Sequence, residues 1–246
     1  VTSLLGLSQT GIYTTAFYIG MVIEIPRRAI SQISIPFISE NIKNQKIKKI
    51  ESYYKEISLH QTIIGVLFYL LVIINIDYIF NLIPNSENFI SGKNVVYVIG
   101  FSKLIIMFFS FNSEIISLSK YYRFTVVTII ILAIISIILN LILIPIYGMI
   151  GAALASFISL LIFNLIKHIF IKLKMKISPF SINTLKVILI GIILFTIDYY
   201  LMPALSNDFL AILLKSAVTT TLYLSIIYLL KISPKLNGMI KSFIKN

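Results

Sequence analysis

Long runs of apolar residues alternate along the chain with short polar segments. A helix needs about 20 predominantly apolar residues to cross the hydrocarbon core of a bilayer. Seven runs reach this length, at residues 9–38, 57–80, 94–117, 122–145, 149–171, 184–205 and 209–230. The pattern predicts an all-α fold, a polytopic transmembrane helical bundle of about seven spans.

The chain starts at Val1-Thr2-Ser3, with no initiator methionine and no basic segment ahead of an apolar core. Such a start does not resemble a signal peptide. We therefore expect a piece of a longer protein, in which residues 1–8 form the end of a preceding helix or its loop.

Composition agrees with lipid as the main solvent. Of the 246 residues, 58% are hydrophobic and only 12% are charged. A soluble domain carries about 25% charged residues to cover its surface, so this chain has too few for a water-facing shell. Cysteine is absent, which excludes disulfides and cysteine-based metal or redox centres.

The formal net charge of +12 raises the possibility of a nucleic-acid partner. The basic residues, however, are spread over separate connections between the apolar runs. Segments 39–56, 118–123, 167–183 and the C-terminal tail are rich in lysine or arginine, whereas 81–93, 145–148 and 203–208 are poor in them. Because basic connections face the cytoplasm, this alternation predicts a cytoplasmic C-terminus and argues against nucleic acid.

Residues 42–57 have a helical pattern of their own. Ile47, Ile50, Tyr54 and Ile57 recur at helical spacing, with lysines between them. This pattern favours an amphipathic helix lying on the anionic cytoplasmic leaflet. A solvated connector is the alternative interpretation.

Residues 140–156 predict a helical hairpin. Pro145 and Gly148 mark the end of one span, and small residues open the next. The small-xxx-small spacing of Gly151 with Ala155, and of Ala152 with Ser156, allows two helix backbones to approach closely. We interpret these residues as packing residues in preference to substrate contacts.

The same stretch resembles the second-lobe signature of Wzx-type polysaccharide flippases, in the multidrug/oligosaccharidyl-lipid/polysaccharide exporter superfamily. Residues 11–16 resemble the entry to a helix of that lobe, and Pro36-Phe37-Ile38-Ser39 resembles its exit. Residues 112–122 resemble the approach to the signature helix. The resemblance runs over essentially the whole chain and is most specific at 140–156.

The resemblance implies the C-terminal half of a two-lobed exporter. Residues 1–172 would form most of the second lobe, and 173–246 two additional transmembrane helices and a cytoplasmic tail. Its partners would be the missing N-terminal lobe, membrane lipids and an undecaprenyl-diphosphate-linked oligosaccharide. The implied activity is flipping this lipid across the bacterial inner membrane by alternating access, for synthesis of surface polysaccharide such as the O-antigen of lipopolysaccharide. It needs no cofactor.

Charged residues inside spans are costly and mark candidate functional sites. The first run contains Glu24-Ile25-Pro26-Arg27-Arg28. Glu24 and Arg28 can pair at i,i+4 spacing, and Pro26 permits a bend. The guanidinium group suits phosphate oxygens, so we expect Arg27 and Arg28, with Glu24, to bind the diphosphate or an acidic sugar. The alternative is that both arginines extend to the cytoplasmic interface.

The third run places Lys103, Ser110 and Glu114 at near-helical spacing. Lys103 is the second expected substrate contact. Glu114 and Asp198 are weaker candidates for coupling to a proton or cation, and for Glu114 a solvated position at the cytoplasmic end is the favoured alternative. Neither His60 nor His168 forms a metal-ligand pattern, so no metal site is expected.

Two other functions compete with flipping. A small-molecule or drug exporter of the same superfamily would favour acids inside the membrane, whereas Arg27, Arg28 and Lys103 favour an anion. A membrane-integral glycan polymerase or ligase would need acid–base groups on a large outer loop. The longest outward segment, 81–93, offers only Glu87 and Lys93, so we expect no enzymatic activity and no catalytic residues.

Overall fold

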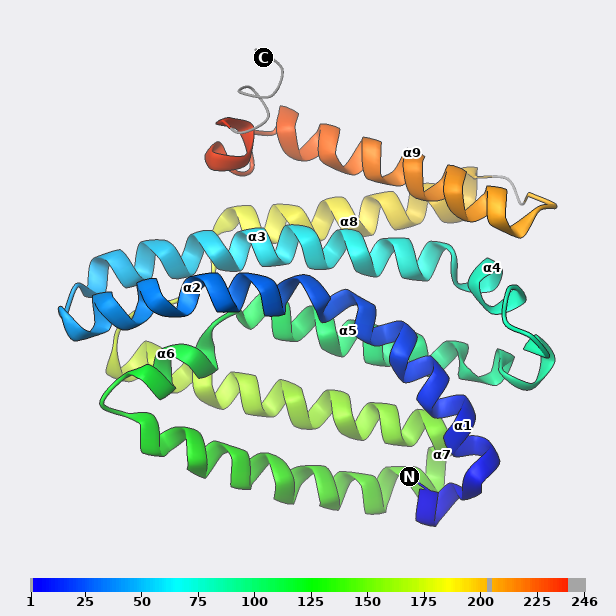
Figure 1. The fold of residues 1–246 in the computed structure, drawn as a ribbon, viewed down its shortest axis with the longest axis horizontal. Coiled ribbons are helices and arrows are strands. Elements are labelled where there is room, and N and C mark those ends of the chain that lie inside the picture. Colours follow the sequence, from blue (N-terminus) through cyan, green and yellow to red (C-terminus); the bar gives the residue numbers. More distant parts are fainter. Residues whose placement is uncertain (1, 203–204, 239–246) are drawn as a thin grey trace.

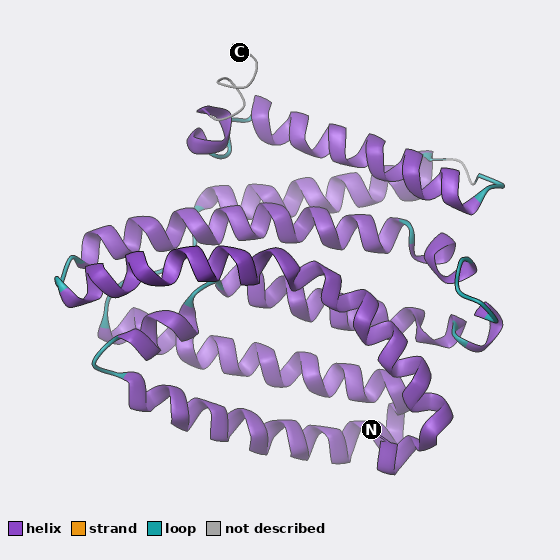
Figure 2. Ribbon diagram, viewed as in Figure 1, coloured by secondary structure: helices purple, strands orange, loops and turns teal. Residues whose placement is uncertain are grey.

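The computed structural model describes all residues except 1, 203–204 and 239–246, so the last lysines of the tail, Lys241 and Lys245, lie outside it. Every regular element in the described residues is a helix (Figure 2). The α-helices are α1 (Thr2–Met21), α2 (Ile25–Lys43), α3 (Ile47–Ile74), α4 (Ile76–Asn81), α5 (Lys93–Phe109), α6 (Asn112–Leu118), α7 (Tyr122–Lys174), α8 (Ile182–Leu201) and α9 (Asp208–Leu229). Three short 3-10 helices, η1 (Val22–Glu24), η2 (Ser86–Asn88) and η3 (Ile90–Gly92), lie between them. The predicted all-α fold is confirmed.

Five of the helical segments in the described chain are long and apolar enough to cross a membrane. They are Ile47–Ile74, Ile90–Phe109, Tyr122–Lys174, Ile182–Leu201 and Asp208–Leu229. The first predicted run, 9–38, is not among them and is instead the kinked series α1–η1–α2. The fold is therefore that of a helical bundle suited to a membrane, and the count of seven spans stays a prediction.

Helix α7 is a hairpin in which the two arms meet at Gly148. This glycine has φ 58° and ψ −132°, which is not helical, and residues with a Cβ rarely adopt positive φ. The first arm is apolar and mostly exposed, whereas Gly151, Ala152, Ala153 and Ala155 at the start of the second arm are buried. The hairpin expected from residues 140–156 is thus present, and its small residues lie at packed positions.

Segment 42–57 does not form a separate surface helix. Residues 44–46 make the turn between α2 and α3, and the rest is the first part of α3, which continues to Ile74. Ile50, Tyr54 and Ile57 are buried against α2, α6 and α7, in a cluster with Ile38, Ile115 and Ile171. The helical spacing was predicted correctly, but the apolar face packs on protein and not on the leaflet.

The run 94–117 is also interrupted. Helix α5 ends at Phe109, and Ser110 takes φ 51° and ψ −120° before α6 begins at Asn112. Lys103 and Glu114 therefore do not share a face of one helix, as their spacing suggested.

The additional C-terminal helices pack on α3. Val187, Ile190 and Leu194 of α8, with Tyr223 and Ile227 of α9, form one apolar cluster with residues 59–70 of α3. The Tyr223 hydroxyl donates to the Ile63 carbonyl oxygen at 2.8 Å. Figure 1 shows α8 and α9 on the side of α3 that faces away from α7.

The connections separate by charge at the two ends of the bundle (Figure 1). The α2–α3, α6–α7 and α7–α8 connections lie at one end, which we call the lysine-rich end. Its basic residues include Lys43, Lys46, Lys48, Lys49, Lys120, Arg123, Lys172, Lys174 and Lys176. The α3–α5 connection, the turn between the two arms of α7 and the start of α9 lie at the opposite, lysine-poor end.

Labelling from the two sides of a membrane tests this separation. The chain has no cysteine, so single cysteines are clean reporters. We expect Asn44→Cys and Glu87→Cys, both at exposed positions, to react with a membrane-impermeant maleimide from opposite sides of right-side-out and inverted vesicles. Reaction of both from the same side would contradict the arrangement.

Candidate functional site

Four charged side chains form an ion-pair series inside the bundle, which we call the charge ladder. It runs from Lys103 on α5 to Glu24 on η1, then to Arg27 on α2 and Glu114 on α6. Lys103 Nζ lies 2.9 Å from Glu24 Oε2, and Arg27 lies 3.7 Å from Glu24 Oε1 and 3.2 Å from Glu114 Oε1. The ladder thus connects residues that are far apart in sequence.

The ladder is sheltered by the surrounding helices. The exposed fractions of its four side chains are between 13% and 18%. The Ser31 hydroxyl donates to Glu114 Oε1 at 3.3 Å, and the ring of Phe17 lies 5.5 Å from Lys103 Nζ. Buried ion pairs cost desolvation and need partners on all sides, so a sheltered ladder in an apolar bundle is a candidate functional site.

The turn between α1 and α2 positions Glu24 and Arg27. Glu24 is the last residue of η1 and the N-cap of α2. Residues three apart are neighbours on a helix surface, and Arg27 faces the glutamate. Arg28 is exposed, and no ion pair to it occurs among the described residues. The predicted Glu24–Arg28 pair is therefore wrong. Pro26 lies in the first turn of α2, where its missing N–H costs no helical hydrogen bond.

The end of α1 and η1 pack closely against α5. A Cβ at Gly20 would lie 2.7 Å from Ile99 Cγ2, and a Cβ at Gly100 would lie 2.8 Å from Ile23 Cδ1. The two glycines allow the backbones to approach, which brings Glu24 within reach of Lys103. The lysine lies one turn beyond Gly100 on α5.

Lys167 is a further buried cation beside the ladder. Only 1% of this residue is exposed, although the sequence placed it in a basic connection. Its ammonium donates to Ser113 Oγ at 2.9 Å and lies 3.6 Å from the centre of the Phe163 ring. The signal in the sequence was helical spacing, because Ser156, Ser159, Phe163 and Lys167 recur along one side of the second arm.

Two polar atoms of the ladder have no hydrogen-bond partner in the described residues. They are Arg27 Nε and Glu114 Oε2, and both are buried. A buried donor or acceptor without a partner costs about 1–3 kcal/mol. The ladder therefore retains a donor and an acceptor for a further group.

Asp198 lies away from the ladder. Its Oδ2 is 3.2 Å from Lys215 Nζ, and the pair joins α8, one turn before its end, to α9. Figure 1 shows α8 ending at the lysine-poor end of the bundle. The structure thus brings together four of the expected residues, Glu24, Arg27, Lys103 and Glu114, and separates Arg28 and Asp198 from them. His60 contacts Ser233, and the described residues contain no cluster of three or more potential metal ligands.

No protein-family model, curated protein or solved structure matches the chain.

Proposed function

We propose that the chain belongs to a membrane transporter that flips an undecaprenyl-diphosphate-linked oligosaccharide for cell-surface polysaccharide synthesis. In this proposal the chain has about seven spans. Residues 1–172 form most of the second lobe of a two-lobed exporter, and residues 173–246 form two additional transmembrane helices and a cytoplasmic tail. The lysine-rich end and the C-terminus face the cytoplasm of a bacterium, which follows from the positive-inside rule. The support for the family comes from the resemblance of residues 140–156.

The observation that carries the proposal is the sign of the charge inside the bundle. The ladder holds two acids and two bases, and Lys167 adds a third base, so the five groups carry a net charge of +1. A positive centre among apolar helices favours an anionic substrate. A diphosphate also supplies acceptor oxygens for Arg27 Nε, which has no partner, and arginine binds phosphate oxygens in a planar, bidentate geometry.

The ladder would act as a set of exchangeable contacts. In the proposed cycle the diphosphate replaces Glu24 or Glu114 as the partner of Arg27 and Lys103. The freed glutamates then pair with other groups or with water. Alternating access requires contacts that differ between two states, and a ladder on η1, α2, α5 and α6 provides contacts that change when these helices move.

A small-molecule or drug exporter is the second candidate. The apolar cavity between α3, α5 and α8, of about 620 Å³, has a size typical of small-molecule sites. Such an exporter of cations would need an excess of acids, and the centre has an excess of bases. The diphosphate proposal is therefore favoured over it.

Lys167 gives the sharpest test, because it carries the excess charge. We expect Lys167→Met, made in the protein expressed from its complete gene, to lower flipping of a fluorescent undecaprenyl-diphosphate oligosaccharide in proteoliposomes by at least about tenfold. The loss corresponds to one charged hydrogen bond. Lys172→Met, at an exposed position of the same helix, is the matched control and should flip at the normal rate.

Normal flipping by Lys167→Met, with normal protein folding, would contradict the assignment of a cationic centre that binds an anionic substrate. Equal loss in both variants would indicate a general effect of removing a lysine from α7. Independently, the genomic sequence upstream should encode a similar first lobe, and neighbouring glycosyltransferase genes would support the glycan substrate.

A further inference from the structure

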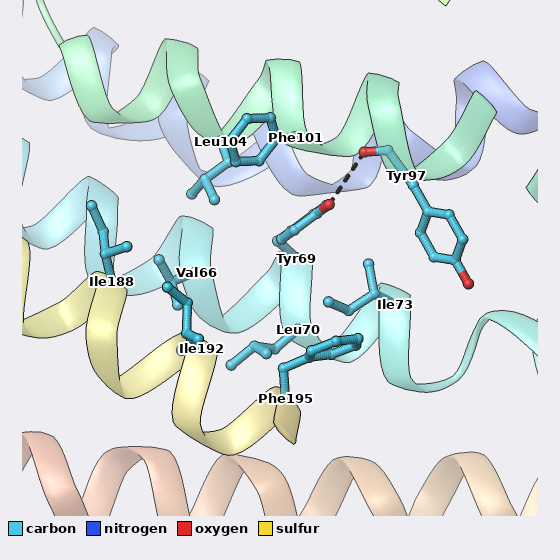
Figure 3. A pocket seen from close by; sticks show the side chains of 11 residues that line it. Val66, Tyr69, Leu70, Ile73, Tyr97, Phe101, Leu104, Ile188, Ile192 and Phe195 are labelled. Carbon is cyan, nitrogen blue, oxygen red and sulfur yellow. Dashed lines mark hydrogen bonds between the residues drawn. The ribbon is translucent and has the colours of Figure 1, made fainter. Parts of the chain in front are cut away.

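A long apolar groove lies between α3, α5 and α8, and no residue of the charge ladder lines it. Its volume is about 620 Å³, and no charged residue lines it. Figure 3 shows it running along α3, from Ile188 and Val66 to Ile73 and Phe195. The Tyr69 hydroxyl donates to the Tyr97 carbonyl oxygen at 3.3 Å, so this hydroxyl is already satisfied. The groove suits a hydrocarbon chain.

The groove continues into a charged pocket at the lysine-poor end. The second cavity, of about 430 Å³, shares Ile73, Tyr97 and Phe195 with the groove. It is also lined by Asp198 and Lys215. One site therefore combines an apolar length with a charged end, which is the chemistry of a membrane lipid.

Asp198 offers an acceptor to this pocket. Its side chain is only 9% exposed, and its Oδ2 pairs with Lys215 at 3.2 Å. Its Oδ1 is buried and has no hydrogen-bond partner in the described residues. Such an atom costs about as much as a lost hydrogen bond, and it lies on a wall of the pocket. The missing partner must be a donor.

The pocket also retains donors for an anion. Lys215 has three N–H groups, and the structure assigns one of them to Asp198. The second acid of the pocket, Asp77, pairs with Lys93. Lys93 does not line the pocket, but it neutralises Asp77, so the two ion pairs at the pocket balance. A ligand with a net charge would leave a charge without a partner, whereas a zwitterion would not.

We propose that this site binds a phospholipid with an ethanolamine headgroup. One acyl chain fills the groove, the phosphate accepts from Lys215, and the primary ammonium donates to Asp198 Oδ1. Asp198 lies one turn before the end of α8, and in this proposal the headgroup lies at the same end of the helix. The lipid joins α8 and α9 to the rest of the bundle, and the inference does not depend on the proposed transport function.

The choice of ethanolamine is the testable part. A choline headgroup has the same charge but no N–H to donate to Asp198, and a glycerol headgroup leaves the phosphate charge unbalanced. The probes are therefore phosphatidylethanolamine, phosphatidylcholine and phosphatidylglycerol with identical acyl chains. Each is added to the purified protein in detergent, and bound lipid is counted by native mass spectrometry.

We expect the wild-type protein to retain phosphatidylethanolamine about tenfold better than phosphatidylcholine, as one charged hydrogen bond allows. The double variant Asp198→Leu/Lys215→Met should lose this preference. Replacing a buried ion pair by apolar residues is often neutral for stability, so this variant should fold. Ile192→Trp, which fills the groove from an exposed position, should lower retention of all three lipids.

Asp208→Asn is the control, because it removes a carboxylate at the same end that contacts Asn81 outside the pocket. It should keep the preference. Equal retention of the ethanolamine and choline lipids by the wild-type protein would overturn the proposal without any variant. A preference for the glycerol lipid, or an unchanged preference in the double variant, would overturn it as well.

Discussion

Glu24→Ala should destabilise the protein by about 3–5 kcal/mol, the range for removing one partner of a buried ion pair. Glu24 is the only acid that contacts Lys103 in the described residues, and it also contacts Arg27. Arg27 keeps Glu114 when Glu24 is lost, but Lys103 is left charged and sheltered among apolar helices. For a chain of this length the change corresponds to a fall in melting temperature of roughly 10 °C.

Thermal unfolding followed by circular dichroism measures the effect, because the chain has no tryptophan for a fluorescence assay. The double variant Glu24→Met/Lys103→Met removes the pair together and should recover most of the stability. Glu51→Ala breaks the partly exposed pair with Lys55 and should cost no more than about 1 kcal/mol. Equal melting temperatures for Glu24→Ala and Glu51→Ala would show that the ladder does not stabilise the fold.

Gly151→Ala should prevent the α7 hairpin from closing as observed. A Cβ at this position would lie 2.0 Å from the Leu143 carbonyl oxygen. The obstacle is backbone of the opposing arm, so no side-chain rotation relieves it. We expect a cost of about 3 kcal/mol, at the upper end for overpacking, together with lower yield of folded protein.

Gly11→Ala is the matched control for this substitution. Gly11 lies within α1, and a Cβ there would meet no atom within 4 Å. Alanine favours a helix over glycine by about 1 kcal/mol, so this variant should melt at the same temperature as the wild type or higher. The interpretation of Gly151 fails if both variants melt alike.

The length and position of most helices could be predicted from the sequence, because lipid-exposed helices depend on apolar runs alone. The arms of the hairpin, α8 and α9 begin and end close to the predicted ranges. The breaks within runs could not be predicted. Ser110 takes a positive φ that serine seldom adopts, and only the docking of α6 on α7 explains why the chain turns there. The helical spacing of Ile50 and Tyr54 correctly predicted one apolar face. Spacing alone does not show whether lipid or other helices of the protein pack against that face.

The candidate site was predicted only in part, because the sequence identifies charged residues within apolar runs but not their partners. Glu24, Arg27, Lys103 and Glu114 were identified as candidates because they are charged residues within apolar runs. Placing a charge inside a membrane span costs free energy, so such residues are candidates for function. Their partners depend on tertiary structure. In the folded chain Arg27, and not Arg28, lies between Glu24 and Glu114. Burial of the second arm of α7 to its last turns places Lys167 inside. A lysine near the end of an apolar run is ordinarily a loop residue. The end of the helix cannot be predicted from the sequence precisely enough to place Lys167 inside the bundle instead.

The charge ladder also constrains how the protein is made. Glu24 and Arg27 leave the ribosome well before Lys103 and Glu114 are synthesised, and a charged residue at the centre of a lone helix costs about 2.5–3.5 kcal/mol during insertion by the translocon. The α1–η1–α2 segment is not among the helices apolar enough to cross a membrane. Insertion of this segment into lipid on its own is therefore unfavourable. It should remain beside the translocon until α5 and α6 emerge and neutralise its charges, so that these helices enter the bilayer together.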